Sequence, residues 1–163
     1  MNGDRVHIRP MIEIDIPLIA SMEKAIFPDP WSAGAFEETL VLAIGINLVA
    51  INEQGQPCGY LCAQAVAGEI QIHNIAVDPS CRRRGIGWQL LQEAEREGMA
   101  RGAVCAILEV RVTSTSALAM YGRMGYRRIG LRRAYYRKPV CDALVLLKVI
   151  DGAHAESVRQ DVR

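Results

Sequence analysis

Apolar and polar residues follow two different periods along the chain, which predicts a succession of helices and strands. Apolar residues at positions 14, 18, 19, 22 and 26 have the spacing of one helical face, so a helix is expected over residues 13–26. A second helix is expected from Ser32, a favourable N-cap, to about residue 42. The remaining pattern predicts strands over 6–9, 46–51, 58–66, 69–77, 104–112, 126–136 and 142–149, and helices from 86 to about 102 and over 114–124.

This order of elements, β-α-α-β-β-β-α-β-α-β-β, predicts one mixed α/β domain. We expect the domain to span residues 1–150, followed by a polar C-terminal tail at residues 151–163. Half of the 163 residues are hydrophobic, yet no apolar run is long enough for a membrane span, which favours a globular protein. Five cysteines without a Cys-x-x-Cys pair fit neither a disulfide framework nor a zinc site. With no signal-peptide pattern in residues 1–10, we expect a cytoplasmic protein that needs no metal.

The strand expected at 69–77 carries an irregular pattern. Its apolar residues lie at positions 70 and 72 and then at 75 and 77, so the alternation slips by one residue. Such a slip moves the apolar side chains to the other face, which predicts a β-bulge near His73 and Asn74. A bulge leaves backbone groups available to a ligand; the alternative is a strand end that enters a loop.

Charge is distributed unevenly between the two halves of the chain. Residues 1–80 contain ten acidic and three basic side chains, whereas residues 81–163 contain eight acidic and sixteen basic ones. Of the sixteen arginines, fourteen follow position 80. Arginine binds phosphate and carboxylate groups in a bidentate manner, so an anionic ligand of the second half is one interpretation. Ion pairs with the acidic first half are the other.

The segment Arg82-Arg83-Arg84-Gly85-Ile86-Gly87 joins a strand to a helix. Three cations, flexible glycines and a helix N-terminus at one point are typical of a phosphate or pyrophosphate site. The segment lacks the Lys-Ser/Thr of a Walker loop and the third glycine of a dinucleotide fingerprint. A tight turn without a ligand is the alternative interpretation.

Four segments of the chain together resemble the GCN5-related N-acetyltransferase (GNAT) superfamily, and within it the ribosomal-protein-alanine N-acetyltransferase (RimI-like) branch. They are Asn74-Ile75-Ala76-Val77-Asp78-Pro79, Arg82-x-x-Gly85-x-Gly87, Leu108-Glu109-Val110-Arg111 and Ala119-Met120-Tyr121-x-x-x-Gly125-Tyr126. The segments Phe27-Pro28-x-Pro30-Trp31-Ser32 and Arg132-Arg133-x-Tyr135-Tyr136 match the branch. The chain departs from the family at Thr115, where an asparagine is usual.

The resemblance implies an α/β fold with a mixed, mostly antiparallel sheet that is splayed between its fourth and fifth strands and flanked by helices on both faces. It also implies acetyl-CoA as the acetyl donor. The residues that it assigns to the cofactor are Ile75, Ala76 and Val77 through their backbone, and Arg82, Arg83, Arg84, Gly85, Ile86, Gly87 and Trp88 around the pyrophosphate.

Two side chains are candidates for the proton transfers that acetyl transfer requires. Glu109 is an acidic residue inside an otherwise apolar strand, where a charge needs a purpose or a partner. It is either the general base or the ion-pair partner of Arg111, and the resemblance favours the base. Tyr121 is the candidate general acid, because a phenol can protonate a thiolate; the alternative is a core aromatic residue.

The substrate side of the molecule is less clearly marked. The candidates are Phe27, Trp31, Arg132, Tyr135 and Tyr136, which either contact an extended peptide N-terminus or cover the core at the sheet edge. The resemblance implies acetylation of the N-terminal amine, expected on alanine, of a ribosomal protein, with no membrane or nucleic acid required and the oligomeric state open. Two alternatives stay open: a GNAT enzyme for a small amine or lysine, and an arginine-rich nucleic-acid or ribosome-binding module without catalysis.

Overall fold

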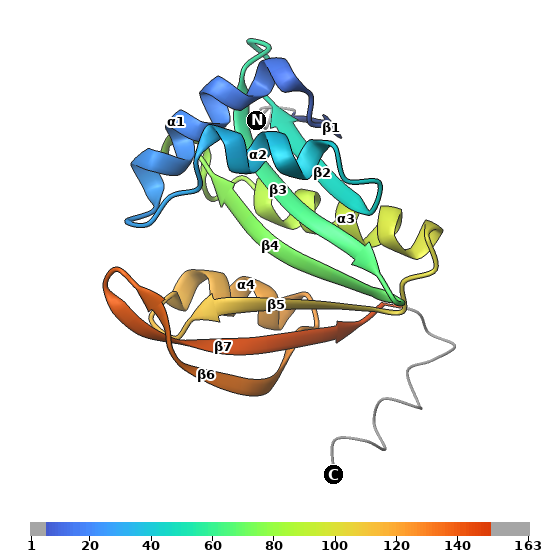
Figure 1. The fold of residues 1–163 in the computed structure, drawn as a ribbon, viewed down its shortest axis with the longest axis vertical. Coiled ribbons are helices and arrows are strands. Elements are labelled where there is room, and N and C mark those ends of the chain that lie inside the picture. The colour runs from blue at the N-terminus through green and yellow to red at the C-terminus, as the bar shows by residue number, and fades with distance from the viewer. Residues whose placement is uncertain (1–5, 151–163) are drawn as a thin grey trace. The chain divides into compact units, whose positions relative to one another are not determined.

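The computed structural model describes residues 6–150, so the predicted tail at 151–163 lies outside the described residues. The strands are β1 His7–Pro10, β2 Gly45–Ile51, β3 Pro57–Val66, β4 Glu69–Val77, β5 Cys105–Arg111, β6 Arg127–Arg137 and β7 Val140–Val149 (Figure 1). The helices are α1 Ile16–Ile26, α2 Ala33–Leu40, α3 Ile86–Ala100 and α4 Thr115–Arg123, with 3-10 turns η1 Glu13–Asp15 and η2 Pro79–Cys81. The predicted order of helices and strands is confirmed.

The strands form a sheet in the order β1-β2-β3-β4-β5-β7-β6. The pair β4–β5 is parallel, whereas β1–β2, β2–β3, β5–β7 and β6–β7 are antiparallel. The parallel ladder runs from Glu69–Cys105 to Ile72–Leu108, so it uses only the first part of β4. The predicted mixed, mostly antiparallel α/β fold is confirmed, and β4 and β5 are paired only along the first part of β4.

The chain forms two compact units, which we call the N-terminal unit and the C-terminal unit. Among the described residues, the N-terminal unit contains 6–64 and 73–94, and the C-terminal unit contains 65–72 and 95–150. Strand β4 contributes to both units, because the boundary follows Ile72. Helix α3 is likewise divided, after Ala94.

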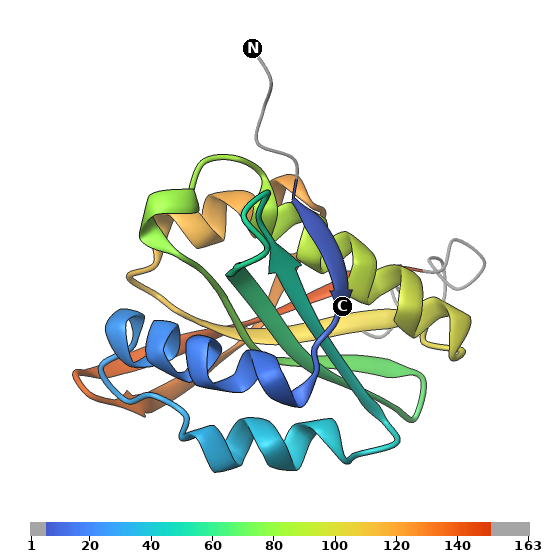
Figure 2. The same cartoon turned by 90° about the horizontal axis from the view of Figure 1, so that it is seen from above.

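In the N-terminal unit, helices cover both faces of the strands (Figure 2). The side chains of Tyr60 on β3, Ile19 on α1 and Phe36 on α2 are fully buried in one apolar cluster. The neighbouring residue Gly59 faces the other way, and a Cβ at this position would lie 3.2 Å from the side chain of Ile86 on α3. Alternation along one strand therefore places α1 and α2 on one face and α3 on the other.

The buried face of α1 differs from the predicted one. Ile16, Ile19 and Met22 are buried, but Ile14 and Leu18, which were expected on the same face, are 79% and 53% exposed. The physical reason is that α1 begins at Ile16 and is preceded by the 3-10 turn η1, so residues 13–15 do not continue the period of the helix.

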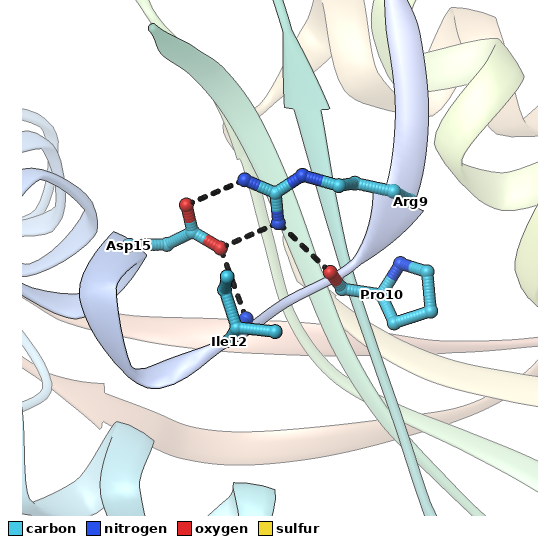
Figure 3. Close-up of polar contacts among 4 residues, drawn as sticks. All are labelled: Arg9, Pro10, Ile12 and Asp15. Carbon is cyan, nitrogen blue, oxygen red and sulfur yellow. Dashed lines mark hydrogen bonds and ion pairs between the residues drawn. The ribbon is translucent and has the colours of Figure 1, made fainter.

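An ion pair fixes the entry into α1 (Figure 3). The Arg9 guanidinium on β1 donates two hydrogen bonds to the buried Asp15 carboxylate, at 2.7 and 2.8 Å. Asp15 also accepts a bond from the Ile12 backbone N–H at 2.9 Å, and Arg9 donates to the Pro10 carbonyl at 2.9 Å. Burial opposes ionisation of Asp15, but the Arg9 and Ile12 bonds and the Arg9 charge outweigh it and lower the carboxyl's pKa below the usual 3.8.

In the C-terminal unit, a buried glutamate connects α3 to the sheet. Glu95 accepts hydrogen bonds from the Tyr126 hydroxyl at 2.9 Å and from the Lys148 ammonium at 2.5 Å. Its side chain is 8% exposed and that of Lys148 is 22% exposed. Close approach of α3 to β4 also depends on Gly98, because a Cβ there would collide with the Ile70 side chain.

Helix α4 ends as predicted, at a glycine in the left-handed conformation. Gly125 has a φ of 94°, and the Tyr126 N–H donates to the Tyr121 carbonyl at 3.0 Å. A second bond runs from the Gly125 N–H to the Gly122 carbonyl at 3.2 Å, which completes a Schellman motif. The motif fixes the last turn of α4, on which Tyr121 lies.

Candidate active site

The arginine- and glycine-rich loop between β4 and α3 belongs to the N-terminal unit and has the backbone of an anion site. Arg83 and Gly85 both have left-handed φ values, 66° and 76°. Left-handed residues in such a loop turn successive N–H groups toward one side. The first bond of α3 runs from the Gln89 N–H to the Gly85 carbonyl, so the N–H groups that precede Gln89 at this end have no partner within the helix.

The side chains of this loop fit a pyrophosphate. Arg82, Arg83 and Arg84 are all exposed, and a Cβ added at Gly85 would meet no atom within 4 Å, so the space above the loop is open. Arg82 Nε also donates to the Val77 carbonyl at 3.1 Å, which connects the loop to the end of β4. Ile86 is buried, so it can offer a ligand only its backbone. The positive end of the helix dipole adds to the attraction for anions.

The predicted reversal of faces near His73 and Asn74 is confirmed by the packing of β4. The Ile70 side chain lies against α3. Asn74 bonds to Glu23 on α1, and Ala76 belongs to the apolar cluster beneath α1 and α2. Positions 70, 74 and 76 would share one face in a regular strand, so the alternation slips by one residue between 70 and 74, as a β-bulge requires.

Glu109 lies on β5 in the C-terminal unit and pairs with Arg132. Arg132 Nε donates to Glu109 Oε1 at 3.0 Å, and the Glu109 side chain is 25% exposed. The alternative pairing with Arg111 is wrong. Arg111 donates to the carbonyls of Lys138 and Pro139 at 2.9 and 3.1 Å, because the β6–β7 turn lies within its reach. One predicted substrate residue, Arg132, therefore contacts the predicted base.

Tyr121 lies on α4 and is 5% exposed. Its ring packs edge-on against Tyr126, with the ring centroids 5.6 Å apart. Burial, and to a lesser degree the nearby Tyr136, raises the pKa of the Tyr121 phenol above its usual value. Burial therefore makes the Tyr121 phenol a weaker acid than an exposed tyrosine. Tyr121 is a core aromatic residue, as one interpretation predicted, and its role as general acid stays a prediction.

An irregularity in β6 exposes Tyr135 beside Tyr136. The register with β7 shifts between Arg132 and Tyr136, and Ala134 within this stretch has a φ of 47°. The Asp142 carboxylate stabilises the irregular stretch by accepting a bond from the Ala134 N–H at 2.8 Å.

The two tyrosines differ in exposure. Tyr135 is 48% exposed, and its ring lies 5.1 Å from that of Tyr136. Burial, with a further contribution from Tyr135, raises the pKa of Tyr136 to about 12. The Arg111 guanidinium lies 4.1 Å from the centre of the Tyr136 ring, a cation–π geometry. The C-terminal unit thus brings together five predicted site residues, which are Glu109, Tyr121, Arg132, Tyr135 and Tyr136.

Phe27 and Trp31 lie in the N-terminal unit, on the loop between α1 and α2. Both are partly buried and pack against the apolar cluster of this unit. The Trp31 ring is 5.4 Å from that of Phe36. These two residues therefore cover the core, as one interpretation predicted, and their remaining surface is accessible to a ligand.

Sequence reasoning missed a buried carboxylate beneath this loop. Glu23 on α1 is 1% exposed and accepts hydrogen bonds from the Tyr60 hydroxyl, the Asn74 amide and the Trp31 backbone N–H. The signal was present in the sequence, because Glu23 interrupts the apolar stripe formed by Ile19, Met22 and Ile26.

Among residues 6–150, no helix has the length and apolarity that a membrane crossing requires. The same residues contain no cluster of three or more acidic, histidine or cysteine side chains placed to bind a metal.

Comparison with known proteins agrees with this geometry. The model of the acetyltransferase (GNAT) family matches residues 16–126. The N-alpha-acetyltransferase RimI of Mycobacterium tuberculosis is 35% identical over 162 residues, which cover 96% of this chain and 92% of that protein. The ribosomal protein bS18-alanine N-acetyltransferase of Escherichia coli is 32% identical over 124 residues, 75% of this chain and 81% of that protein. The crystal structure of the ribosomal-protein-S18-alanine N-acetyltransferase from Escherichia coli superposes with a TM-score of 0.82 at 28% identity, covering 90% of this chain and 95% of that one.

Proposed function

Because the chain belongs to the GNAT family and is an acetyl-CoA-dependent N-acetyltransferase, we propose that it acetylates the N-terminal α-amine of a ribosomal protein, with alanine as the preferred first residue. The support is the similarity to relatives whose names state this activity, over most of both chains. We place the reaction in the cytoplasm, where such an acceptor is synthesised.

The N-terminal unit is proposed to hold the acetyl donor. Arg82, Arg83 and Arg84, with the backbone N–H groups of residues 85–88, bind the pyrophosphate, and the backbone of residues 75–77 pairs with the pantetheine and the acetyl group. The Val77 N–H stabilises negative charge that develops on the acetyl oxygen. Bound there, acetyl-CoA supplies an activated thioester. Thr115 replaces the usual asparagine and is exposed on the first turn of α4, so we assign it no cofactor contact.

The C-terminal unit is proposed to move the protons. Glu109 accepts the proton of the acceptor amine, directly or through a water molecule. The ion pair with Arg132 keeps the Glu109 carboxylate in place, and its partial exposure leaves it accessible to an acceptor. Tyr121 Oη supplies the proton to the leaving thiolate.

An α-amine acceptor suits a single carboxylate base. The pKa of an α-amine is about 7.7 to 8.0 and that of a lysine is about 10.4, so near pH 7 roughly a tenth of the former is already neutral. The difference corresponds to about 3.4 kcal/mol that a lysine-directed enzyme must additionally supply. The residues proposed to contact the peptide are Phe27, Trp31, Arg132, Tyr135 and Tyr136.

The observation that carries the proposal is the pairing of Glu109 with Arg132, in the unit that also contains Tyr121, on the fold of an N-acetyltransferase. The decisive experiment offers acetyl-CoA with a panel of peptides that differ in the first residues, and measures release of free CoA. We expect the highest kcat/KM for a ribosomal-protein N-terminus that begins with alanine. Stronger activity on lysine side chains or small amines would overturn the proposed acceptor. Absence of acetyl-CoA binding by calorimetry would overturn the enzyme and favour the binding-module alternative.

A further inference from the structure

The loop Phe27–Trp31 between α1 and α2 has few backbone donors with which to hold its shape. Pro28 and Pro30 have no N–H, so the loop has backbone N–H groups only at residues 27, 29 and 31. The Phe27 N–H donates to the Glu23 backbone carbonyl at 2.9 Å. The Trp31 N–H donates to Glu23 Oε1, also at 2.9 Å. Two of the three donors, at the two ends of the loop, therefore bind one residue.

The second carboxylate oxygen of Glu23 connects the same residue to the strands. Oε2 accepts from the Tyr60 hydroxyl on β3 and from Asn74 Nδ2 on β4, the latter at 3.1 Å. Asn74 immediately precedes residues 75–77, the part of β4 proposed to bind the acetyl group. Glu23 thus joins the loop to the strand through hydrogen bonds that lie entirely within the N-terminal unit.

The chemistry of Glu23 is unusual for a purely structural residue. Its side chain is fully buried, yet its three hydrogen-bond donors are all uncharged. A buried carboxylate without a cation is costly, and an apolar residue of similar volume would fill this position in the core without that cost. Burial and the Glu23 carboxylate raise the pKa of the Tyr60 phenol, so Tyr60 remains a donor. A carboxylate at this position is explained if one oxygen is needed to bind the loop and the other to bind the strands.

We propose that Glu23 is the positioning residue of the acceptor site, which fixes the Phe27–Trp31 loop to β4 and thereby sets the affinity for the peptide. The proposal rests on the proposed function for the identity of the acceptor. It assigns Glu23 no contact with either substrate. Its effect is expected in the KM for the peptide, because a mobile loop must be ordered again each time a peptide binds.

The central test replaces Glu23 by methionine, which has a similar volume and no acceptor oxygens. For Glu23→Met we expect a rise of about tenfold or more in the peptide KM, with kcat within about threefold of the wild type. The calorimetric Kd for acetyl-CoA should rise by less than the peptide KM, because Glu23 bonds directly to the loop at 27–31 but reaches residues 75–77 only through Asn74. A peptide KM unchanged in the folded variant would overturn the proposal.

The matched control is Tyr60→Phe, which removes a buried donor from the same carboxylate but leaves the bond from Glu23 to Trp31. It should lower the melting temperature while the peptide KM stays within about twofold. Equal increases of the peptide KM in Tyr60→Phe and Glu23→Met would mean that Glu23 acts only through the stability of the core, and would overturn the positioning role.

A measurement on the wild-type protein needs neither substrate nor a variant. Hydrogen exchange followed by NMR should show the Trp31 amide exchanging at least about 100-fold more slowly than its intrinsic rate. Exchange near the intrinsic rate would overturn the proposal even if Glu23→Met does not fold. Glu23→Gln keeps one acceptor oxygen without the charge, so its Trp31 amide should show intermediate protection. Because exchange requires no acetyl transfer, a failure of the proposed acceptor in the peptide panel would leave this result interpretable.

Discussion

Each unit of the molecule buries one glutamate against a tyrosine hydroxyl, but the two carboxylates are stabilised differently. Glu95 in the C-terminal unit pairs with the Lys148 ammonium as well as with Tyr126. Glu23 in the N-terminal unit binds uncharged donors, one of which is the backbone N–H of Trp31.

The difference shows what each glutamate holds in place. Glu95 joins secondary-structure elements, since its partners lie on β7 and at the start of β6, and a cation offsets the cost of its burial. Glu23 joins a loop that has little structure of its own to a strand, and this requires acceptor atoms in fixed positions rather than neutralisation of charge. We therefore expect substitutions at Glu95 to affect mainly stability, and substitutions at Glu23 to affect mainly the peptide KM.

The largest expected effect concerns a third glutamate, Glu109, which extends the comparison because it is only partly buried and pairs with Arg132. Glu109→Gln should lower kcat by about 10²- to 10³-fold at pH 7, since general base catalysis typically contributes this much. The defect should shrink as the pH rises through the pKa of the acceptor amine, about 7.7 to 8.0, because the amine then loses its proton unaided. Steady-state kinetics from pH 6.5 to 9 measure both effects. A kcat within threefold of the wild type at pH 7 would contradict the role of Glu109 as base.

The next largest effect is expected when the ion pair between Glu95 and Lys148 is broken. Lys148→Met should lower the free energy of unfolding by about 3 kcal/mol, because it leaves an uncompensated buried carboxylate. The double variant Glu95→Gln with Lys148→Met should recover most of this loss, since neither charge remains. Urea denaturation of the two variants and the wild type gives the values. If Lys148→Met were no less stable than the double variant, the cation would not be what stabilises Glu95.

A smaller effect is expected at Asp15. It tests whether a buried carboxylate contributes mainly to stability because its partner is a cation, or because of the unit in which it lies. Asp15 lies in the N-terminal unit, but like Glu95 it pairs with a cation, Arg9 (Figure 3). Asp15→Asn should lower the free energy of unfolding by about 2 kcal/mol at pH 7, with the peptide KM unchanged.

The pH dependence of Asp15 provides an independent check. Its pKa is lower in the folded state than the usual 3.8, so the stabilisation is fully present above that value and is lost as the pH falls through the folded pKa. In denaturation experiments between pH 5 and pH 2, the wild-type advantage over Asp15→Asn should therefore disappear at the acidic end. An advantage that persists at pH 2 would contradict this assignment.

The smallest effect on the free energy of unfolding is expected for an exposed ion pair. Glu97 on α3 and Arg101, just after the end of this helix, form an ion pair with a nitrogen–oxygen distance of 2.5 Å, and both side chains are about a third exposed. Arg101→Ala should change the free energy of unfolding by less than about 0.5 kcal/mol, because solvent and salt screen the pair. Thermal unfolding at low and high salt should show the difference vanishing as the salt concentration increases.

Most features that depend on nearby residues could be predicted from the sequence. Ser32 was expected as an N-cap, and its hydroxyl accepts a bond from the Ala35 N–H at 3.2 Å. Gly125 was expected to end α4, and it does so in the left-handed conformation. A turn containing Gly85 was expected between β4 and α3, and Gly85 has a left-handed φ of 76° there. Each of these rests on contacts within about five residues, which a linear sequence displays directly.

Features that depend on distant residues could not be predicted in this way. Glu109 pairs with Arg132, which is 23 residues away, and not with its neighbour Arg111, because strand order and the irregularity in β6 decide which guanidinium is near. The hydrogen bond from Asn74 to Glu23 spans 51 residues.

The sequence by itself therefore determined the order of elements, the family and the residue types available for chemistry, because periodicity, capping and motif spacing are local properties. Only the tertiary structure decided which of those residues act together. It buried the Tyr121 phenol and placed Arg132 beside Glu109. It also placed the two carboxylate oxygens of Glu23 between a proline-rich loop and a strand. Burial and long-range pairing fix these properties, and both arise only when segments far apart in the chain pack against each other.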